Sequence, residues 1–516
     1  METTPRLLDV IERLDATDDT AAFIQFVQNG AHDPNDLVFA VYHLLTRLRF
    51  RSAYILASFL TERGIQNPFL SIALCIGALI IHNPAHETYG LEHLAAQADQ
   101  LLAEQPAIHA HIHAEIMDPA MRHLLAIAIA HSDQTRILQL LEILKAFVPR
   151  FRGIFDWNAP VPEFSLADMQ HRGRQQAPRL IRYPSPPAGR PQPRRVTVVL
   201  REFIFPDKSW SRPFDVGPRI VAAMNRYGWQ TVFYPLKGND LVAEALEIVA
   251  LCRQQQTELL VLDDDILIKA MPLRSDLIAR LRQALPALKI VGFLADAWEP
   301  EADLLRESAS LIERIWSLDA PSRPLWEEPE LAPKMLHLPI PFQTGNYRTP
   351  QTPLSGQAHF SGSISGFNWH RAFWVPAFER ARLPIKVAIA SHQTDGLSAL
   401  ESYSVYMRTL AEATCCISLA MRPNHHCIVT SRSFETIHSG SLLIQETSED
   451  MYRYFIPGEH YLEFSTLPEL AAVLRFVQEH PAEAEAIRRR GNAFIWEWYG
   501  DEKLIGYLDQ ALFSPA

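Results

Sequence analysis

The sequence has few cysteines, no long apolar run and no excess of basic charge, and each of these shortages argues against a class of protein. Five cysteines in 516 residues, without regular spacing, do not form a disulfide framework and fit a reducing compartment. The longest apolar run, residues 70–81, is shorter than the about 20 residues of a membrane-spanning helix. A formal net charge of −11 argues against a general nucleic-acid binder, which carries a basic domain or stripe.

The start of the chain, residues 1–19, is rich in acidic side chains and has no apolar signal core. We therefore expect a cytoplasmic protein without a secretion signal or a membrane span. A hydrophobic content of 48% with 21% charged residues is ordinary for a globular chain. At 516 residues the chain exceeds what a single core supports, so about three domains are expected.

Residues 1–155 show apolar residues at helical spacing and no convincing strand alternation. Helix boundaries are marked by glycines and by pairs of a polar residue and a proline. These pairs are Asp33-Pro34, Asn67-Pro68, Asn83-Pro84, Gln105-Pro106 and Asp118-Pro119. The region is predicted to be all-helical. It is either a stack of tetratricopeptide-type (TPR-like) hairpins or an irregular bundle, since no clean consensus period aligns.

Residues 156–195 are rich in proline and arginine and poor in apolar periodicity. This composition predicts an extended, loosely packed linker. The basic run could contact an acidic partner, but a solvated connector is the simpler interpretation. With a linker here, residues 196–516 are expected to fold and bind a ligand without residues 1–155.

From residue 196 onward, predicted strands and helices alternate in two successive sets, 196–342 and 343–516. Strands of the first set are predicted at 195–205, 230–234, 258–262, 289–294, 314–318 and 334–338. Strands of the second set are predicted at 359–365, 384–390, 415–420, 441–446 and 460–464. Such alternation predicts parallel sheets covered by helices. The expected fold class is therefore α/β, with two Rossmann-like units whose strands point their carboxyl ends at a shared cleft.

In the second set, the strand 415–420 is followed by a loop and then by a predicted helix with the sequence SRSFETIH. Free backbone N–H groups at a helix start favour an anion, and Ser431 and Arg432 add donors there. Glu435 lies one turn further on, where its carboxylate could accept hydrogen bonds from two ribose hydroxyls. The alternative is that Arg432 and Glu435 form an ion pair across one helical turn.

The stretch that begins at Arg432 resembles the nucleotide-sugar-binding half of GT-B glycosyltransferases. It looks closest to the group 1 and spore-maturation-protein-like branches. The matching positions are Phe434, Glu435, Gly440, Phe455, Gly458 and Glu459. Upstream, FSGSISGFNWHR resembles the first strand and glycine loop of that half, with Gly362, Gly366 and Arg371 at matching places. Residues 196–342 match in layout only.

The resemblance implies a nucleotide-sugar donor in the cleft, with its ribose on Glu435 and its diphosphate on the helix start and nearby arginines. The candidate donor-binding residues are Glu435, Arg432, Ser431, Arg371 and Gly362. His426 is added because its loop is expected at the cleft, where the imidazole could contact the donor phosphates. Many relatives carry a first glutamate eight positions before the second, and this sequence has Cys427 there. Retaining and inverting stereochemistry therefore both stay open. Because GT-B enzymes generally bind their donor without a metal, neither a metal nor a cofactor is expected.

A candidate general base follows the predicted strand 289–294, where KIVGFLADAW places Asp296 just past the strand end. The alternative is that Asp296 caps the next helix. The adjacent Asp263, Asp264 and Asp265 could hold a divalent ion, but a solvated loop is the preferred interpretation.

Two histidines and three cysteines of the second set suggest zinc at first sight: Cys415, Cys416, His425, His426 and Cys427. Their spacing is not that of zinc ligands, so no metal site is predicted.

The sequence thus predicts a glycosyltransferase that moves a sugar from a nucleotide-sugar to an acceptor, such as a protein or glycan presented by the helical domain. A non-catalytic helical scaffold with a degenerate cleft is one alternative, and it predicts that no nucleotide binds. A GT-B-fold sugar-nucleotide epimerase is another, but an epimerase needs no acceptor and leaves the helical domain unexplained. The helical domain could also mediate homo-oligomer contacts.

Overall fold

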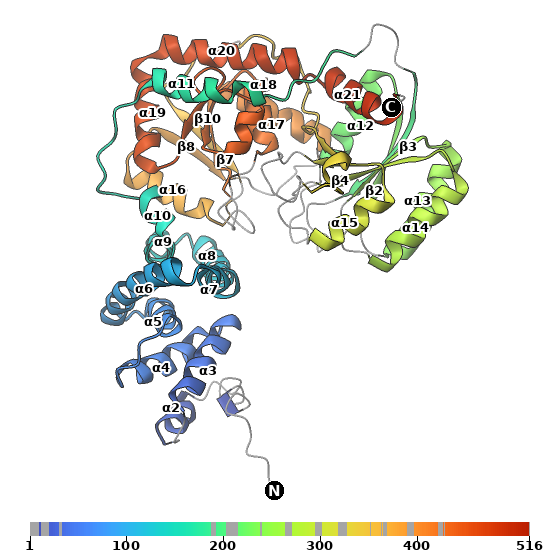
Figure 1. The fold of residues 1–516 in the computed structure, drawn as a ribbon. Helices are drawn as coiled ribbons and strands as arrows, with labels where there is room; N and C mark the ends of the chain where they lie inside the picture. The colour runs from blue at the N-terminus through green and yellow to red at the C-terminus, as the bar shows by residue number, and fades with distance from the viewer. Residues whose placement is uncertain are drawn as a thin grey trace. The chain divides into compact units, whose positions relative to one another are not determined.

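The computed structural model describes residues 10–11, 20–29, 33–186, 192–202, 215–237, 240–263, 271–294, 302–317, 328–350, 352–362, 364, 369–389, 397–421, 427 and 429–514. The chain divides into two compact units (Figure 1). The helical unit comprises Met1–Pro160, Ser363–Leu383 and Thr466–Pro468. The sheet unit comprises Val161–Gly362, Pro384–Ser465 and Glu469–Ala516.

The described part of the helical unit is all-helical apart from its turns, as predicted. Its helices are α2 (Thr20–Asn29), α3 (Pro34–Thr46), α4 (Phe50–Thr61), α5 (Pro68–Ile81), α6 (Pro84–Glu104), α7 (Pro106–Ile112), α8 (Asp118–Ala130), α9 (Gln134–Phe147), α10 (Pro149–Ile154) and α16 (Arg371–Arg380). A π-helical turn, His113–Met117, joins α7 to α8, so the chain does not break at Asp118. Each helix from α3 to α6 packs against the next one along the chain.

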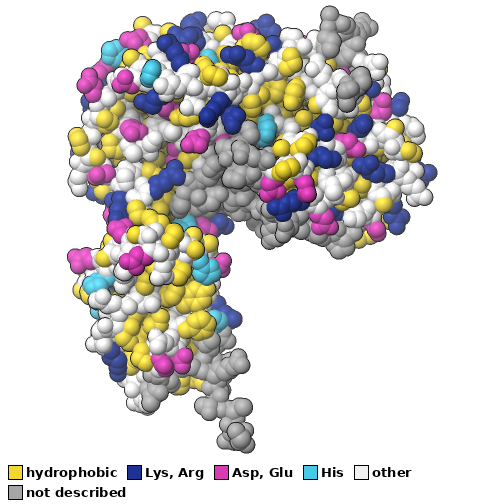
Figure 2. Space-filling view, viewed as in Figure 1, with side chains coloured by type: hydrophobic (Ala, Val, Ile, Leu, Met, Phe, Trp, Pro, Cys, Tyr) yellow, Lys and Arg dark blue, Asp and Glu magenta, His cyan; other side chains and the backbone are white. Residues whose placement is uncertain are grey.

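Helix starts in this unit follow from the polar residue and proline pairs. The side chain of Asp33 accepts a hydrogen bond from Asn35 N at 2.8 Å, and that of Asn67 accepts one from Phe69 N at 2.9 Å. Proline follows each of these caps. An N–H group at the first helical position has no acceptor within the helix, so proline loses no hydrogen bond there. Helix α5 is buried along most of its length, which explains the apolar run 70–81. Large hydrophobic side chains also reach the surface of this unit (Figure 2), among them Phe39, Ile81 and Ile108.

Helix α16 packs in the helical unit although it connects two strands of the sheet unit in sequence. Trp369 Nε1 donates a hydrogen bond to Asp118 Oδ1 at 2.8 Å. The ring of Trp374 lies 4.7 Å from that of Phe155. The N-terminal helices and this crossover helix therefore share one core. This corrects the expectation that residues 196–516 fold alone, because removal of residues 1–155 would uncover buried aromatic rings of α16.

The first sheet of the sheet unit has six parallel strands in the order β2-β1-β3-β4-β5-β6. The strands are β1 (Arg195–Arg201), β2 (Gln230–Leu236), β3 (Leu259–Asp263), β4 (Lys289–Leu294), β5 (Arg314–Ser317) and β6 (Met335–His337). The helices between them are α12 (Val216–Tyr227), α13 (Leu241–Gln255), α14 (Met271–Ala284) and α15 (Ala302–Leu311). Alternate strand residues enter two separate cores, one with α12 and the other with α13, α14 and α15. Helices therefore cover both faces of the sheet.

The second sheet has five parallel strands in the order β11-β10-β9-β7-β8. The strands are β7 (Ala358–Gly362), β8 (Ile385–Ile389), β9 (Cys415–Ser418), β10 (Leu442–Glu446) and β11 (Leu462–Phe464). The remaining helices are α17 (Ala399–Ala413), α18 (Ser431–His438), α19 (Leu467–Glu479), α20 (Pro481–Trp498) and α21 (Asp501–Phe513). The predicted fold class is confirmed: two Rossmann-like sheets with a helical N-terminal region. None of the described helices has the length and apolar character needed to cross a membrane.

The stretch predicted as a loose linker is partly folded onto the second sheet's side of the unit. It contains helix α11 (Leu166–Gln176), where Gln170 Nε2 donates to Gly458 O at 3.0 Å. Further along, Tyr183 is 1% exposed and its hydroxyl donates to His337 O. The expectation of a solvated connector is therefore wrong for this part of the chain. Its few apolar and amide side chains contact specific partners elsewhere in the chain, and composition alone does not predict such contacts.

One apolar core spans both sheets. The ring of Phe434 on α18 lies 6.0 Å from that of Phe342, which follows β6, and 5.7 Å from that of Tyr499 after α20. Beyond Tyr499, α21 packs against α12 of the first sheet. The C-terminal helix thus closes on the first sheet and holds α12 near α18.

We predict that Trp374→Ala lowers the free energy of unfolding of the helical unit by about 3–5 kcal/mol, the usual cost of removing a buried aromatic ring. Trp374 is 1% exposed, whereas Phe39 is 54% exposed. Phe39→Ala is therefore the matched control and should change stability by less than about 0.5 kcal/mol. Denaturant titration followed by circular dichroism measures both. Equal, small effects would show that α16 is not held by this core.

Candidate functional site

Helix α18 begins at the edge of the second sheet where ligands bind in open α/β folds. It follows β9 in the chain and precedes β10, and both strands are parallel, so their carboxyl ends lie at one edge. The residue before the helix, Thr430, is extended and its side chain makes no capping hydrogen bond. The backbone N–H of Ser433 donates to Thr430 O at 3.0 Å. The N–H groups of Ser431 and Arg432 have no side-chain cap and can receive an anion.

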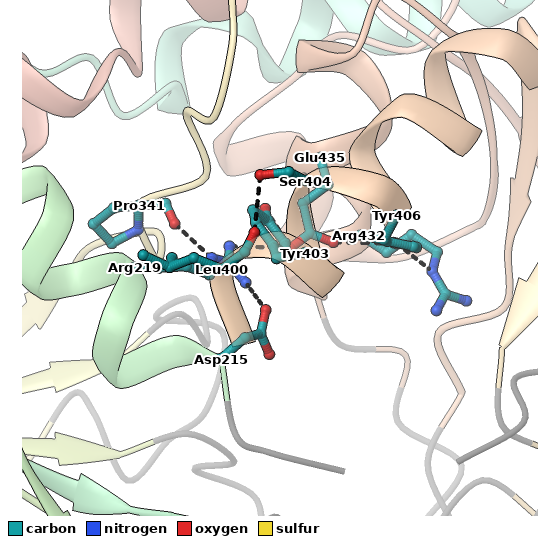
Figure 3. Close-up of polar contacts among 9 residues, drawn as sticks. All are labelled: Asp215, Arg219, Pro341, Leu400, Tyr403, Ser404, Tyr406, Arg432 and Glu435. Atoms are coloured by element: carbon teal, nitrogen blue, oxygen red, sulfur yellow. Dashed lines mark hydrogen bonds and ion pairs between the residues drawn. The ribbon is translucent and has the colours of Figure 1, made fainter. Parts of the chain in front are cut away.

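The carboxylate of Glu435 is the centre of a buried polar network (Figure 3). Glu435 is 5% exposed. Its Oε1 accepts a hydrogen bond from the Tyr403 hydroxyl at 3.0 Å, and its Oε2 accepts one from the Tyr406 hydroxyl at 3.2 Å. Both tyrosines lie on α17, so α17 and α18 are joined through one carboxylate.

Arg219, on α12 beside the first sheet, completes the network. Its Nη2 lies 3.0 Å from Glu435 Oε1, and its Nη1 donates to Asp215 Oδ2 at 3.2 Å. Its Nε donates to Pro341 O at 2.9 Å, and its guanidinium carbon lies 3.9 Å from the centre of the Tyr403 ring. Arg219 therefore connects the first sheet to the second through a buried ion pair.

Among the described residues, Arg432 and Glu435 form no direct ion pair. The hydroxyl of Tyr406 lies between them. Arg432 Nε donates to this hydroxyl at 3.2 Å, and the hydroxyl donates to Glu435 Oε2. Arg432 is partly exposed. Figure 3 shows its guanidinium directed away from Arg219. The simple ion pair across one helical turn is thus replaced by a bridged contact.

The environment favours the protonated tyrosines and the charged arginines. Burial, together with the charge of Glu435, raises the pKa of Tyr403 and of Tyr406 above their ordinary values, although Arg219 and Arg432 oppose this. Burial lowers the pKa of Arg219, but Tyr403, Glu435 and Asp215 more than offset it and the net shift is upward. The tyrosine hydroxyls therefore remain hydrogen-bond donors to Glu435 throughout the neutral range.

Three of the predicted donor-site residues lie together on α18: Ser431, Arg432 and Glu435. Gly362 is the buried last residue of β7 in the sheet unit. Arg371 is the first residue of α16 and is 7% exposed within the helical unit. The remaining predicted residues, Asp296 and His426, lie outside the described residues.

Asp263 is not part of a solvated loop. It is 1% exposed at the end of β3, and its Oδ1 lies 3.0 Å from Arg201 Nη2 at the end of β1. Asp264 and Asp265 lie outside the described residues. Within the described parts of the chain, no three His, Cys, Asp or Glu side chains are grouped as metal ligands.

The network includes residues that sequence reasoning missed: Arg219, Tyr403, Tyr406 and Asp215. Tyr403 and Tyr406 stand three positions apart on one helix, which is a local signal for a shared face. Arg219 stands in the first turns of α12, but no local pattern pairs it with a glutamate beside the other sheet.

Residues 370–499 match the model of a family described as glycosyl transferase-like. This segment is therefore similar to the proteins of that family. The match contains α17, α18 and the whole network apart from Asp215, Arg219 and Pro341. It confirms the resemblance predicted from the sequence, while the spore-maturation-protein-like branch stays a prediction. No curated protein matches the chain.

Solved glycosyltransferases overlay on the chain at low similarity. HepE from Anabaena, in complex with UDP and glucose, is 10% identical, with a TM-score of 0.41 over 62% of this chain and 100% of that chain. A glycosyltransferase from Rickettsia africae is 8% identical, with a TM-score of 0.42 over 62% of this chain and 100% of that chain. An O-GlcNAc transferase mutant from Thermobaculum terrenum is 12% identical, with a TM-score of 0.35 over 93% of this chain and 98% of that chain. TM-scores below 0.5 do not by themselves establish a common arrangement.

Arg219→Met is expected to lower the free energy of unfolding of the sheet unit by about 3–5 kcal/mol, because it leaves the buried carboxylate of Glu435 without its charged partner. Arg280→Met is the matched control, since Arg280 lies exposed on α14. Chemical denaturation of both variants checks the expectation. A loss no larger than that of Arg280→Met would show that the ion pair does not hold the sheets together.

Proposed function

We propose that the protein is a glycosyltransferase whose nucleotide-sugar donor binds at the start of α18. The observation that carries the proposal is one constellation inside the glycosyl transferase-like segment. A helix start without a side-chain cap, a partly exposed arginine and a buried glutamate follow one another at the carboxyl edge of a parallel sheet. Each of these groups matches one part of a nucleoside diphosphate.

The diphosphate is assigned to Ser431, Arg432 and the first turn of α18. Arg432 uses its Nε on Tyr406, and within the described residues its two Nη nitrogens have no hydrogen-bond partner. A guanidinium with two unengaged Nη groups presents parallel donors that suit phosphate oxygens. The N-terminal end of the helix adds its partial positive charge at the same place.

The ribose is assigned to Glu435, with Tyr406 in the place of a ribose hydroxyl. The Tyr406 hydroxyl contacts both Glu435 Oε2 and Arg432 Nε, which are the acceptor and the donor that a sugar hydroxyl requires. Because Tyr406 is only partly buried, it can turn away when the ribose arrives. In this proposal, Tyr403 and Arg219 keep the carboxylate oriented throughout.

The remaining roles are proposed on sequence grounds. Arg371, Gly362 and His426 are assigned to the donor site, and Asp296 is assigned as the general base that takes the proton of the acceptor hydroxyl. Transfer is proposed to need no metal and no cofactor, in the cytoplasm. The helical unit, with its exposed hydrophobic side chains (Figure 2), is proposed to present a protein or glycan acceptor and to carry any homo-oligomer contact.

The donor site is tested by titration calorimetry with UDP, GDP, TDP and CMP. Glu435→Gln should weaken binding of the preferred nucleotide by about 1–3 kcal/mol, because a neutral amide replaces a charged hydrogen-bond acceptor. Glu412→Gln is the matched control, since Glu412 is exposed on α17 and undergoes the same change of charge. It should bind the nucleotide nearly as the wild type does.

Two outcomes of this titration contradict the proposal in different ways. Equal nucleotide affinity in the wild type and in a folded Glu435→Gln variant would leave Glu435 as a link between helices and nothing more. No binding of any nucleotide to the wild type would favour the non-catalytic scaffold instead.

The base assignment has its own test. Asp296→Asn should keep nucleotide affinity and slow glycosyl transfer by about 10²–10⁴-fold, the usual contribution of a positioned general base. Asparagine keeps the size of the side chain and still caps a helix, so the change isolates proton transfer. Turnover close to that of the wild type, measured with the true acceptor, would leave Asp296 as a cap.

A further inference from the structure

Buried polar side chains follow one another at the carboxyl end of β10. The strand begins with the apolar residues 442–444 and continues with Gln445 and Glu446, and Ser448 follows two positions later. Each of these three polar residues is at most 3% exposed. Apolar side chains of similar shape would fill the same space at little or no cost in stability. Stability of the fold alone therefore does not account for three buried polar residues in so short a stretch.

Glu446 holds the chain where it leaves β9. Its Oε2 accepts hydrogen bonds from Ala420 N at 2.8 Å and from Met421 N at 2.9 Å. Both of these residues are buried. Residues 422–426 and 428, which come next, lie outside the described residues. The connection from β9 to α18 is therefore fixed at its beginning.

Ser448 and Gln445 hold the same connection where it enters α18. The Ser448 hydroxyl donates to Cys427 O at 2.6 Å, and Cys427 also pairs with Met421 in an antiparallel bridge. Gln445 Oε1 accepts a hydrogen bond from Ser433 Oγ at 2.9 Å, in the first turn of α18. One anchor therefore lies before the helix start and the other lies just after it.

The two backbone N–H groups assigned to the diphosphate, those of Ser431 and Arg432, lie between these two anchors in the chain. Donors that are held in place before a ligand arrives bind it without the entropic cost of ordering them. The ribose ligand Glu435 is held separately, by Tyr403 and Arg219. We therefore expect the anchors to affect the affinity for the phosphates and not the affinity for the ribose.

We propose that Gln445, Glu446 and Ser448 are positioning residues of the donor site. They fix the connection between β9 and α18 so that the N–H groups of Ser431 and Arg432 are ready to receive a diphosphate. The three side chains act through the backbone that they hold and do not contact the donor. The inference rests on the proposed function and adds which residues set the affinity for the phosphates.

Titration calorimetry with three pairs of ligands tests the inference: UDP with uridine, GDP with guanosine, and TDP with thymidine. Ser448→Ala should weaken binding of the preferred diphosphate about two- to tenfold, the equivalent of one hydrogen bond, and leave binding of its nucleoside unchanged. Gln445→Met keeps the length of the side chain and should have the same effect through the other anchor. Ser448→Thr keeps the hydroxyl and should retain the wild-type ratio of the two affinities.

Ser441→Ala is the matched control. Ser441 is 2% exposed, directly precedes β10, and donates its hydroxyl to Leu410 O. The change removes the same kind of hydrogen bond at the opposite end of the same strand. It should alter neither the diphosphate affinity nor the nucleoside affinity.

Two results would overturn the inference while the proposed function stands. One is an equal weakening of diphosphate and nucleoside in the variants, since a general loss of structure lowers both affinities. The other is an unchanged diphosphate affinity in folded Ser448→Ala and Gln445→Met. If the wild type binds no diphosphate at all, the result contradicts the proposed function, and the inference with it.

Discussion

The carboxylate of Glu435 has to be compensated inside the protein, and the arrangement around it follows from that need. A buried charge is costly unless it is paired and hydrogen-bonded. Here Tyr403, Tyr406 and Arg219 supply the compensation, at 3.0, 3.2 and 3.0 Å from the carboxylate oxygens. The partners come from α17 and α12, so one charge determines how two helices approach α18.

The buried carboxylate of Glu435 has two roles that compete for the same oxygen atoms. As a link, it holds α12 of the first sheet against α18 of the second. As a ribose ligand, it must exchange one of its present partners for a sugar hydroxyl. Tyr406 is the partner suited to exchange, since it is only partly buried and bonds through one hydroxyl, whereas Arg219 is 5% exposed and is held on three sides. A donor can therefore enter without loss of the ion pair between the sheets.

Local signals in the sequence predicted the elements well. Polar residue and proline pairs mark the starts of α3, α5 and α6, and the strand 289–294 and the helix 431–438 have the predicted bounds. The sequence predicted Glu435 as a site residue because its position in α18 is a local feature. It did not predict the partner Arg219, because an ion pair between two sheets leaves no pattern in either segment.

Two other differences between the predicted and the observed fold also arise from contacts between segments far apart in the sequence. The proline-rich stretch before β1 lacks periodicity, yet it contains α11, whose partners such as Gly458 lie far along the chain. Helices between the strands were expected to cover the sheets, but the aromatic rings of α16 pack with Phe155 and Phe151 in the helical unit. Composition and periodicity report whether a face is apolar, and they do not report which surface covers it.

Hydrogen exchange at the first two residues of α18, Ser431 and Arg432, measured with and without a saturating nucleotide, is the most direct test of the proposed donor site. A diphosphate bound there accepts hydrogen bonds from these two backbone amides, so their exchange should slow markedly while that of the exposed end of α13 stays unchanged. Calorimetric saturation with no change in exchange at these two residues would place the donor elsewhere and contradict the central claim.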